Sequence, residues 1–582
     1  MRIIMNRLIK KNYFILLLFV IISILLVSLI DWHVGYIFAT GDYHYHLDRI
    51  ETLASSIKHL DFWPKVDGHF IGGYGYASSL FYPDVFLYLP ALLRVVGISP
   101  VITYMFTLVL INFITLWVGY YAGKRMSFSS QRALIFALIY TLNPYRLQTL
   151  YSRQDLGELL GMIFFPLVLS ELMNFKNGYF RQWYILSFAM IGIGLSHTIS
   201  LFMIILFSAM YVLLNIKYFL SKKKIVALMK AAMLTIFATA MIYLPILEQM
   251  HGQKYALTTN PLIQITGQIF SIQDLFKNSL LNSVFHGDTV NIGIVILISL
   301  IVYSIYNFTK RQNIDLTVIA LFLFFACTNL FPWKLLSHSI FAVIQFPWRF
   351  FSIISLIVAY LLVNDDLHLF DRKYFTFIFL TVIALFTINL SQQTITASKN
   401  RLDPYSDFNK IDSYYIGAGH EYLPSQVNYS EIRQHKDRTL TYDKSNISIQ
   451  NPTINRQYIS FNFDSHKGFT KVQLPLIYYK GYQSEVYGDG ISTVPKISPL
   501  GLTEISLSGS GTVKIQYDHT LIQKISLFIS SVTFLLVLFK FIEKRRRYNI
   551  PVTDEIPVFA VSTENDYVFV YRIVENMNNN LN

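Results

Sequence analysis

Cysteine is almost absent from this sequence, and charged residues are scarce. The single cysteine, Cys327, lies inside an apolar run, which excludes a disulfide framework and a cysteine-ligated metal site. Charged residues make up 14% of the 582 positions, whereas soluble domains carry about 25%. Together with a hydrophobic content of 53%, this deficit excludes an ordinary soluble protein.

Long apolar runs are present instead. Runs of roughly 17 residues or more recur along the chain, and each is long enough to cross ~30 Å of hydrocarbon as a helix. The sequence therefore predicts an α-helical polytopic membrane protein with about twelve spans. The first run, Tyr13 to Ile30, is too long for a signal-peptide core and lacks a cleavage site after it, so we expect an uncleaved span.

The basic residues indicate orientation. The net charge of +13 is distributed among short loops on one side, which is the pattern of cytoplasmic loops, and both termini are expected to be cytoplasmic. Nucleic-acid binding would need a basic stripe on one soluble domain, and the sequence has none, so we expect no nucleic-acid partner.

Four regions follow from this pattern. They are a transmembrane domain (1–390), an extracytoplasmic β-rich domain (391–520), a final transmembrane helix (521–542) and a cytoplasmic tail (543–582). Alternating residues on either side of Gly509-Ser510-Gly511 predict a β-hairpin, and we expect the β-rich domain to be a small sandwich. The tail ends in an Asn-rich stretch that we expect to be disordered.

The stretch from Gly41 to Arg49, directly after the first span, concentrates ionisable side chains. Asp42 fits a catalytic base, but it equally fits the N-cap of a helix, and both interpretations stay open. His46 follows Asp42 by one helical turn, and His44 and Asp48 form a second pair with the same spacing.

An amphipathic helix is expected to follow. Apolar residues recur at helical spacing from Leu47 to Leu60, which predicts a helix lying on the outer membrane surface. His44 to Asp48 also fits the H-x-H-x-D pattern of soluble dinuclear metal hydrolases, but Arg49 replaces the next histidine and the membrane context is wrong for that fold. A single divalent metal ion held by Asp42, Asp48 or His46 stays open.

Further polar side chains lie in later outer loops. They are Arg153, Asp155, Glu158, His197, His286, Asp288 and Arg349. Each has an ordinary structural explanation, such as a solvated loop, a cap or a snorkelling arginine. The span interiors hold few charges and give no proton relay or ion pathway, so the pattern favours chemistry or binding at the outer surface over transport.

The arrangement resembles the polytopic glycosyltransferases of the GT-C superfamily, in which an essential Asp lies in the first outer loop before an interfacial helix. More narrowly, the chain is similar to bacterial membrane proteins of the "6-pyruvoyl-tetrahydropterin synthase-related" family. The residues that carry this similarity are Gly41-Asp42-Tyr43-His44-Tyr45-His46, Tyr151-Ser152-Arg153, Gly157-Glu158, Leu195-Ser196-His197, Gln345-Phe346-Pro347-Trp348-Arg349 and Glu421-Tyr422-Leu423-Pro424.

The resemblance implies a multi-pass glycosyltransferase of the bacterial plasma membrane. It implies a polyprenyl-phosphate-linked sugar as donor and an extracytoplasmic glycan, lipid or polymer as acceptor, with membrane lipid around the protein. Asp42 would be the catalytic base, and Arg153, Arg349 and His197 would bind the donor phosphate. The remaining candidates would bind substrate or support the site: His44, His46, Asp48, Asp155, Glu158, His286 and Asp288. The alternative is a non-catalytic flippase, transporter or scaffold in surface-polysaccharide assembly.

Overall fold

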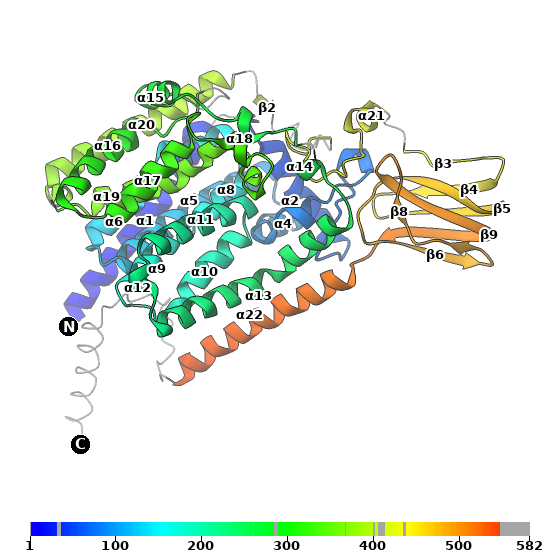
Figure 1. Cartoon of the computed structure of the whole chain (residues 1–582), viewed down its shortest axis with the longest axis horizontal. Helices are drawn as coiled ribbons and strands as arrows, with labels where there is room; N and C mark the ends of the chain where they lie inside the picture. The colour runs from blue at the N-terminus through cyan, green and yellow to red at the C-terminus, as the bar shows by residue number, and fades with distance from the viewer. Residues whose placement is uncertain are drawn as a thin grey trace.

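A bundle of helices with a β-sheet at one end forms the molecule (Figure 1). The computed structural model describes residues 2–31, 36–259, 261–284, 289–366, 368–399, 402–404, 414–434 and 438–547. The first helix begins at the end of the bundle away from the sheet, and the last helix leaves the sheet and returns to that end (Figure 1). The predicted tail lies outside the described residues from position 548 onward.

The helices up to the middle of the chain build one half of the bundle. In order they are α1 (Arg2–Asp31), α2 (Tyr43–Lys58), α3 (Ser78–Phe81), α4 (Tyr88–Val95), α5 (Pro100–Arg125), α6 (Ser130–Thr141), α7 (Pro144–Gln148), α8 (Leu156–Met162), α9 (Phe165–Lys176), α10 (Trp183–Gly194), α11 (Thr198–Leu214), α12 (Ile216–Phe219) and α13 (Lys222–Gly252).

The remaining helices complete the bundle and flank the sheet. They are α14 (Ala256–Thr259), α15 (Ile272–Leu280), α16 (Ile294–Lys310), α17 (Ile314–Ala326), α18 (Trp333–Leu336), α19 (Phe351–Val363), α20 (Lys373–Ala397), α21 (Tyr429–Gln434) and α22 (Leu521–Arg547).

Six helical segments within the described residues are long and apolar enough to cross a membrane. They are Tyr13–Ile30, Pro100–Arg125, Leu156–Lys176, Lys222–Gly252, Lys373–Ala397 and Leu521–Glu543. Further apolar helices of 10–17 residues, such as α16 and α17, fall short of that length. The chain is thus a largely helical membrane protein, as predicted, but the count of about twelve spans is not confirmed.

Close packing of small residues joins α5 to α6. The helix α5 begins where Ser99 accepts the N–H of Ile102 and Pro100 occupies its first turn, both common helix-start features. A Cβ added at Gly123 would lie 2.9 Å from the Cα of Ala133, and one at Gly119 would lie 3.2 Å from the Cα of Ala137. Such small residues let membrane helices approach backbone to backbone.

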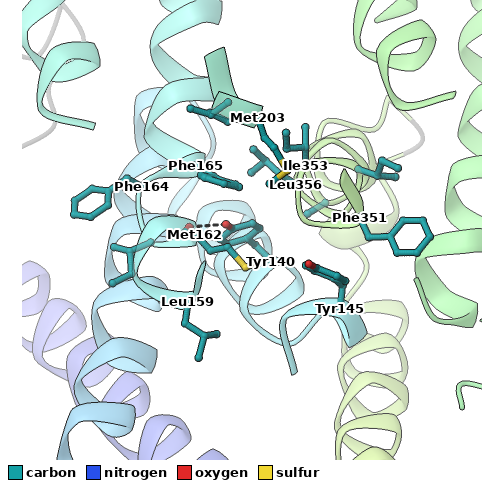
Figure 2. Packing of buried hydrophobic residues seen from close by; sticks show 14 of the residues in the cluster. Tyr140, Tyr145, Leu159, Met162, Phe164, Phe165, Met203, Phe351, Ile353 and Leu356 are labelled. Atoms are coloured by element: carbon teal, nitrogen blue, oxygen red, sulfur yellow. Dashed lines mark hydrogen bonds between the residues drawn. The ribbon is translucent and has the colours of Figure 1, made fainter. Parts of the chain in front are cut away.

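Large apolar and aromatic side chains fill the centre of the bundle (Figure 2). Residues of α6, α8, α9, α11 and α19 meet there, among them Phe165, Met203 and Leu356, all fully buried. The polar tip of Tyr140 is satisfied because its hydroxyl donates to the carbonyl of Met162 at 2.6 Å. Tyr145 lies in this cluster beside Phe351, and its hydroxyl donates a hydrogen bond to Glu158, one of the polar residues described below.

The helix α2 differs from its predicted environment. The sequence predicts an interfacial helix on the outer membrane surface, but residues on several faces of α2 are buried, from Tyr43 and His46 to Arg49 and Ile57. Apolar residues of α2 join the main core, and Tyr45 joins a second, aromatic-rich cluster. The surface prediction is wrong because a 3.6-residue stripe reports burial of a face but not whether lipid or protein buries it.

The sheet is antiparallel and contains seven strands within the described residues. They are β3 (Thr441–Tyr442), β4 (Ile447–Ile454), β5 (Tyr458–Ile477), β6 (Tyr482–Gly488), β7 (Ile491–Ser492), β8 (Lys496–Ile497) and β9 (Leu502–Tyr517). All seven are hydrogen-bonded into one sheet instead of the two of a sandwich. A separate two-stranded ladder pairs β1 (Tyr36–Phe38) with β2 (Leu402–Pro404).

The predicted hairpin at Gly509-Ser510-Gly511 does not form. The strand β9 passes through these residues, and Gly509 pairs with Ser465 while Gly511 pairs with Phe463. The pairing of β5 with β9 shifts register between Ser465 and Thr470, so this point is an irregularity in two long strands. Glycines in a strand fit a bulge as well as a turn, which is why the pattern was ambiguous.

Candidate functional site

The backbone at Asp42 is attached directly to a later loop of the chain, the one that contains Arg153. The N–H of Asp42 donates to the carbonyl oxygen of Arg153 at 2.7 Å. Gly41 has φ +51, and a Cβ there would lie 2.0 Å from the same carbonyl oxygen. Only glycine fits this close approach in a left-handed conformation.

Asp42 occupies the N-cap position of α2, but its carboxylate does not cap the helix. The side chain makes no capping hydrogen bond and is half-buried. The capping interpretation therefore explains the position of Asp42 at the start of the helix but gives no role to its carboxylate, which makes no capping hydrogen bond.

A sharp corner in the chain presents Arg153 and Asp155. The segment η3 (Thr149–Arg153) is a π-helical turn, Gln154 adopts φ +48, and Asp155 then caps α8 by accepting the N–H of Glu158 at 3.0 Å. Isolated π-turns and left-handed non-glycine residues are frequent where backbone strain serves a site. The result is a guanidinium and a carboxylate two residues apart, joined by a hydrogen bond of 3.0 Å.

Buried ion pairs extend from this corner. Arg153 donates to Glu158 at 2.5 Å, and the hydroxyl of Tyr145 donates to the other carboxylate oxygen of Glu158, also at 2.5 Å. The Nε atom of Arg349 lies 3.6 Å from Glu158. Glu158 thus links two guanidiniums that the sequence places far apart, and the charges compensate one another away from water.

Aromatic rings and main-chain oxygens hold the two guanidiniums in place. Arg153 lies 4.8 Å from the ring centre of Trp348. Arg349 donates through Nη1 to the carbonyl of Ile344 at 3.0 Å and to the side chain of Gln345 at 3.2 Å. Its Nη2 atom makes no hydrogen bond within the part of the chain that the structure describes.

Two histidines and Tyr82 surround Asp155. His46 Nε2 lies 3.6 Å from Asp155, and the hydroxyl of Tyr82 donates to the same carboxylate at 3.2 Å. The ring of His197 lies 5.5 Å from that of Tyr82. His197 Nδ1 caps α11 by accepting the N–H of Ser200 at 3.3 Å, so a neutral ring carries its proton on Nε2.

The pKa values of Asp42 and Asp155 are shifted in opposite directions. Burial and then the negative charge of Asp155 raise the pKa of Asp42 to about 7, against the opposing effect of Arg153. Burial alone would raise the pKa of Asp155, but the interaction with His46 and the charges of His197 and Arg153 lower it well below its usual range. Burial lowers the pKa of His197 to about 4, which keeps that ring neutral at pH 7. The site therefore pairs an ionised Asp155 with an Asp42 that exchanges a proton near neutral pH.

Gln345 and Glu421, which the site prediction missed, complete the site. Gln345 bridges Arg349 to Glu421, because its Oε1 accepts from Arg349 at 3.2 Å and its Nε2 donates to Glu421 at 3.1 Å. Both residues belong to motifs recognised in the sequence, but neither a glutamine nor a lone glutamate in a loop signals a contact by itself.

The sequence-predicted candidates divide into three groups. Asp42, His46, Arg153, Asp155, Glu158, His197 and Arg349 are brought together by the structure. His44 and Asp48 lie two positions on from Asp42 and His46, which turns them to another side of α2, where His44 contacts the ring of Tyr415. His286 and Asp288 lie outside the described residues.

The described residues contain no cluster of three typical metal-binding side chains, and the possible divalent ion stays a prediction. Within the described residues, no three His, Cys, Asp or Glu side chains gather where one ion could bind them. Both oxygens of Asp155 already accept protein hydrogen bonds, and His46 contacts Asp155 and Arg49. We therefore derive no step through a metal.

The comparisons with known proteins include a loose structural similarity. No family model matches the sequence, and no curated protein matches it. The apo-form oligosaccharyltransferase of Archaeoglobus fulgidus is similar with a TM-score of 0.35 and 15% identity, over 69% of this chain and 56% of that one. The match thus spans just over half of that enzyme, and at this TM-score it supports no statement about function, which rests on the site itself.

Proposed function

We propose that this chain is a GT-C-like membrane glycosyltransferase that transfers a sugar from a polyprenyl-phosphate-linked donor to an extracytoplasmic glycan, lipid or polymer. The observation that supports this proposal most directly concerns the carboxylate of Asp42. It makes no capping hydrogen bond, and its pKa is raised to about 7 beside the buried pair Arg153 and Arg349. A base and cationic groups in one place are what this transfer needs.

The chemistry follows from these residues. Asp42 takes the proton from a hydroxyl of the acceptor molecule, and the resulting oxygen forms a bond to the anomeric carbon. The bond from that carbon to the phosphate oxygen breaks, and the electron pair leaves with the lipid phosphate. Because the attacking oxygen enters opposite the leaving group, the configuration inverts.

The leaving phosphate is held on the other side of the site. Arg349 offers its Nη2 atom, and His197 offers Nε2–H as a neutral donor. Arg153 is already bound to Asp155 and Glu158, so it contributes positive charge and fixed orientation. We assign no step to His46, which orients Asp155.

The location of the site is part of the proposal. The sheet lies at the end of the bundle opposite the start of α1 (Figure 1). Basic residues follow or precede the spans at the other end, where α1 begins. By the positive-inside rule, the sheet and the site then face the outside of a bacterial plasma membrane. Membership of the "6-pyruvoyl-tetrahydropterin synthase-related" family belongs to the same proposal.

The test is Asp42→Asn, with membrane insertion and abundance verified, scored by the host's surface-glycan profile against a deletion strain. We expect the variant to reproduce the deletion profile, because an amide is not a base. The matched control is Asp61→Asn, which changes an exposed aspartate after the same helix. Full rescue by Asp42→Asn would favour the non-catalytic alternative, a flippase, transporter or scaffold.

A further inference from the structure

The acidic residues of the site differ in how many of their oxygens are occupied. Each oxygen of Asp155 and of Glu158 accepts a hydrogen bond from the protein. The carboxylate of Asp42 accepts none, and Glu421 uses only Oε1, which accepts from Gln345. Within the described residues, Asp42 and Glu421 are thus the acids of this site with capacity left for a ligand.

The loop that carries Glu421 is rigidly attached. The N–H of Leu257 donates to the carbonyl of Glu421 at 3.2 Å, and the N–H of Ala256 donates to that of Leu423 at 2.9 Å. Tyr422 stacks on Phe81 with the ring centres 5.0 Å apart. A carboxylate held in this way is preorganised, although it lies in a loop.

Two contacts bring this outer segment to the first loop and to Arg349. The hydroxyl of Tyr415 donates to the carbonyl of Gly41 at 3.0 Å, next to Asp42. Gln345 has φ +58 and ψ −49, and the N–H of Phe346 donates to the carbonyl of Ile344 at 2.6 Å, which is a classic γ-turn. This rare and strained turn directs the Gln345 amide to Glu421.

A buried hydroxyl without a partner lies in the same place. Tyr45 is 6% exposed, and its hydroxyl makes no hydrogen bond within the described residues. Tyr45 follows Asp42 by three residues at the start of α2, and Tyr422, the neighbour of Glu421, packs against the aromatic-rich cluster that contains Tyr45. An orphaned buried hydroxyl costs about 1–3 kcal/mol unless a ligand satisfies it.

These groups match a sugar hydroxyl better than an ammonium. A hydroxyl accepts from Tyr45 and donates to a carboxylate at once, which an ammonium does not do. Arg49 lies 5.7 Å from the ring centre of Tyr45, and its charge opposes a second cation.

We propose that Glu421 and Tyr45 form the subsite for the acceptor molecule, binding the hydroxyls of an uncharged sugar beside the one that Asp42 deprotonates. This inference rests on the proposed function for the role of Asp42, but sugar binding itself is independent of turnover. The two carboxylates disfavour an anionic sugar, so the subsite discriminates against uronic acids.

The experiment measures binding of neutral disaccharides, and of disaccharides that contain a uronic acid, to the full chain in detergent by ligand-observed NMR. We expect the wild type to bind at least one neutral member in the millimolar range and uronates more weakly. Glu421→Gln should weaken neutral binding about tenfold and reduce the discrimination against uronates, as expected for the loss of a hydrogen bond to a charged group. Glu431→Gln, an exposed change on α21, should alter neither.

Tyr45→Phe distinguishes ligand binding by the Tyr45 hydroxyl from a purely structural role of this residue. Removing an unpartnered hydroxyl should leave the unfolding temperature unchanged or higher, and yet weaken disaccharide binding about threefold to tenfold. Wild-type affinity in both Glu421→Gln and Tyr45→Phe, or no binding of any neutral disaccharide to the wild type, would overturn the subsite. If binding behaves as expected but Asp42→Asn retains function in the host, the catalytic proposal fails and the subsite stands.

Discussion

The N–H of Asp42 donates to the carbonyl oxygen of Arg153 at 2.7 Å, so the candidate base and the centre of the ion-pair network are joined through their backbones. Side-chain rotation at either residue leaves this bond intact. This bond fixes the main chains of Asp42 and Arg153 relative to each other, which Gly41 makes possible, and the ion pairs with Asp155 and Glu158 then orient the guanidinium of Arg153.

Gly41→Ala should break this arrangement. The added Cβ would lie 2.0 Å from the Arg153 carbonyl oxygen, and φ +51 adds about 1–2 kcal/mol of left-handed strain. We expect loss of the surface-glycan phenotype and a lower unfolding temperature in detergent. The control is Gly97→Ala, where φ is +92 but no atom lies within 4 Å, so strain acts alone. Equal effects of the two substitutions would contradict the close-contact argument.

Asp42 should make activity depend on pH near neutrality. Its folded-state pKa is raised to about 7, so the basic form predominates above that pH and transfer should decline as the pH falls below it. Initial rates in membranes between pH 5.5 and 8.5 check this expectation, with about 7 as the inflection. A profile flat through neutral pH would contradict the assignment of Asp42 as base.

The same pKa predicts a stability effect of opposite sense. A carboxyl whose pKa is raised on folding stabilises the folded state below its unfolded value of 3.8, and this contribution is lost as the pH rises through about 7. Asp42→Asn does not ionise, so its unfolding temperature should exceed that of the wild type at pH 8 and match it near pH 4. Thermal unfolding in detergent at both pH values measures the difference, and Asp61→Asn serves as control.

Removal of Arg153 should deprive two buried carboxylates of the cation that they share. Arg153→Gln is expected to destabilise the protein by about 3–5 kcal/mol, because Asp155 and Glu158 lose their shared partner. Adding Glu158→Gln to that variant should recover part of the loss, and a double-mutant cycle on chemical unfolding quantifies the coupling. Additive effects of the two changes would show that the pair is not coupled.

The γ-turn at Gln345 predicts an unusual order of stability. Glycine adopts φ +58 without side-chain strain, which is worth about 1–3 kcal/mol at such positions, whereas alanine retains the strain. Gln345→Gly should therefore unfold at a higher temperature than Gln345→Ala. Both variants lose the bridge to Glu421, so both should weaken disaccharide binding equally. A less stable glycine variant would argue against strain at this turn.

Sequence reasoning found the polar groups of the site but not their roles in the network. Charges between the apolar runs of a membrane protein are conspicuous, and for this reason the sequence predicts Asp42, Arg153 and Arg349 as site residues. Whether a carboxylate is saturated, like Glu158, or open, like Glu421, depends on contacts between distant segments that no spacing rule reveals.

The errors in the fold have a similar origin. The sequence predicts the apolar stripe along α2, but protein covers it instead of lipid. Gly509 borders a register shift in the pairing of β5 with β9 and is not part of a turn. In both cases the local pattern has two physical solutions, and tertiary packing selects between them.

The bond from Tyr415 to Gly41 also constrains how the protein is made. Residue 41 is synthesised long before residue 415, so during translation the loop after α1 lacks the partner that Tyr415 provides in the finished molecule. A nascent chain that stops after α20 contains Asp42, Arg153 and Arg349 but lacks Glu421. Under the proposed function, such an incomplete chain would hold the donor-side groups without the segment that binds the acceptor molecule, so the acceptor subsite forms only after residue 421 has been made.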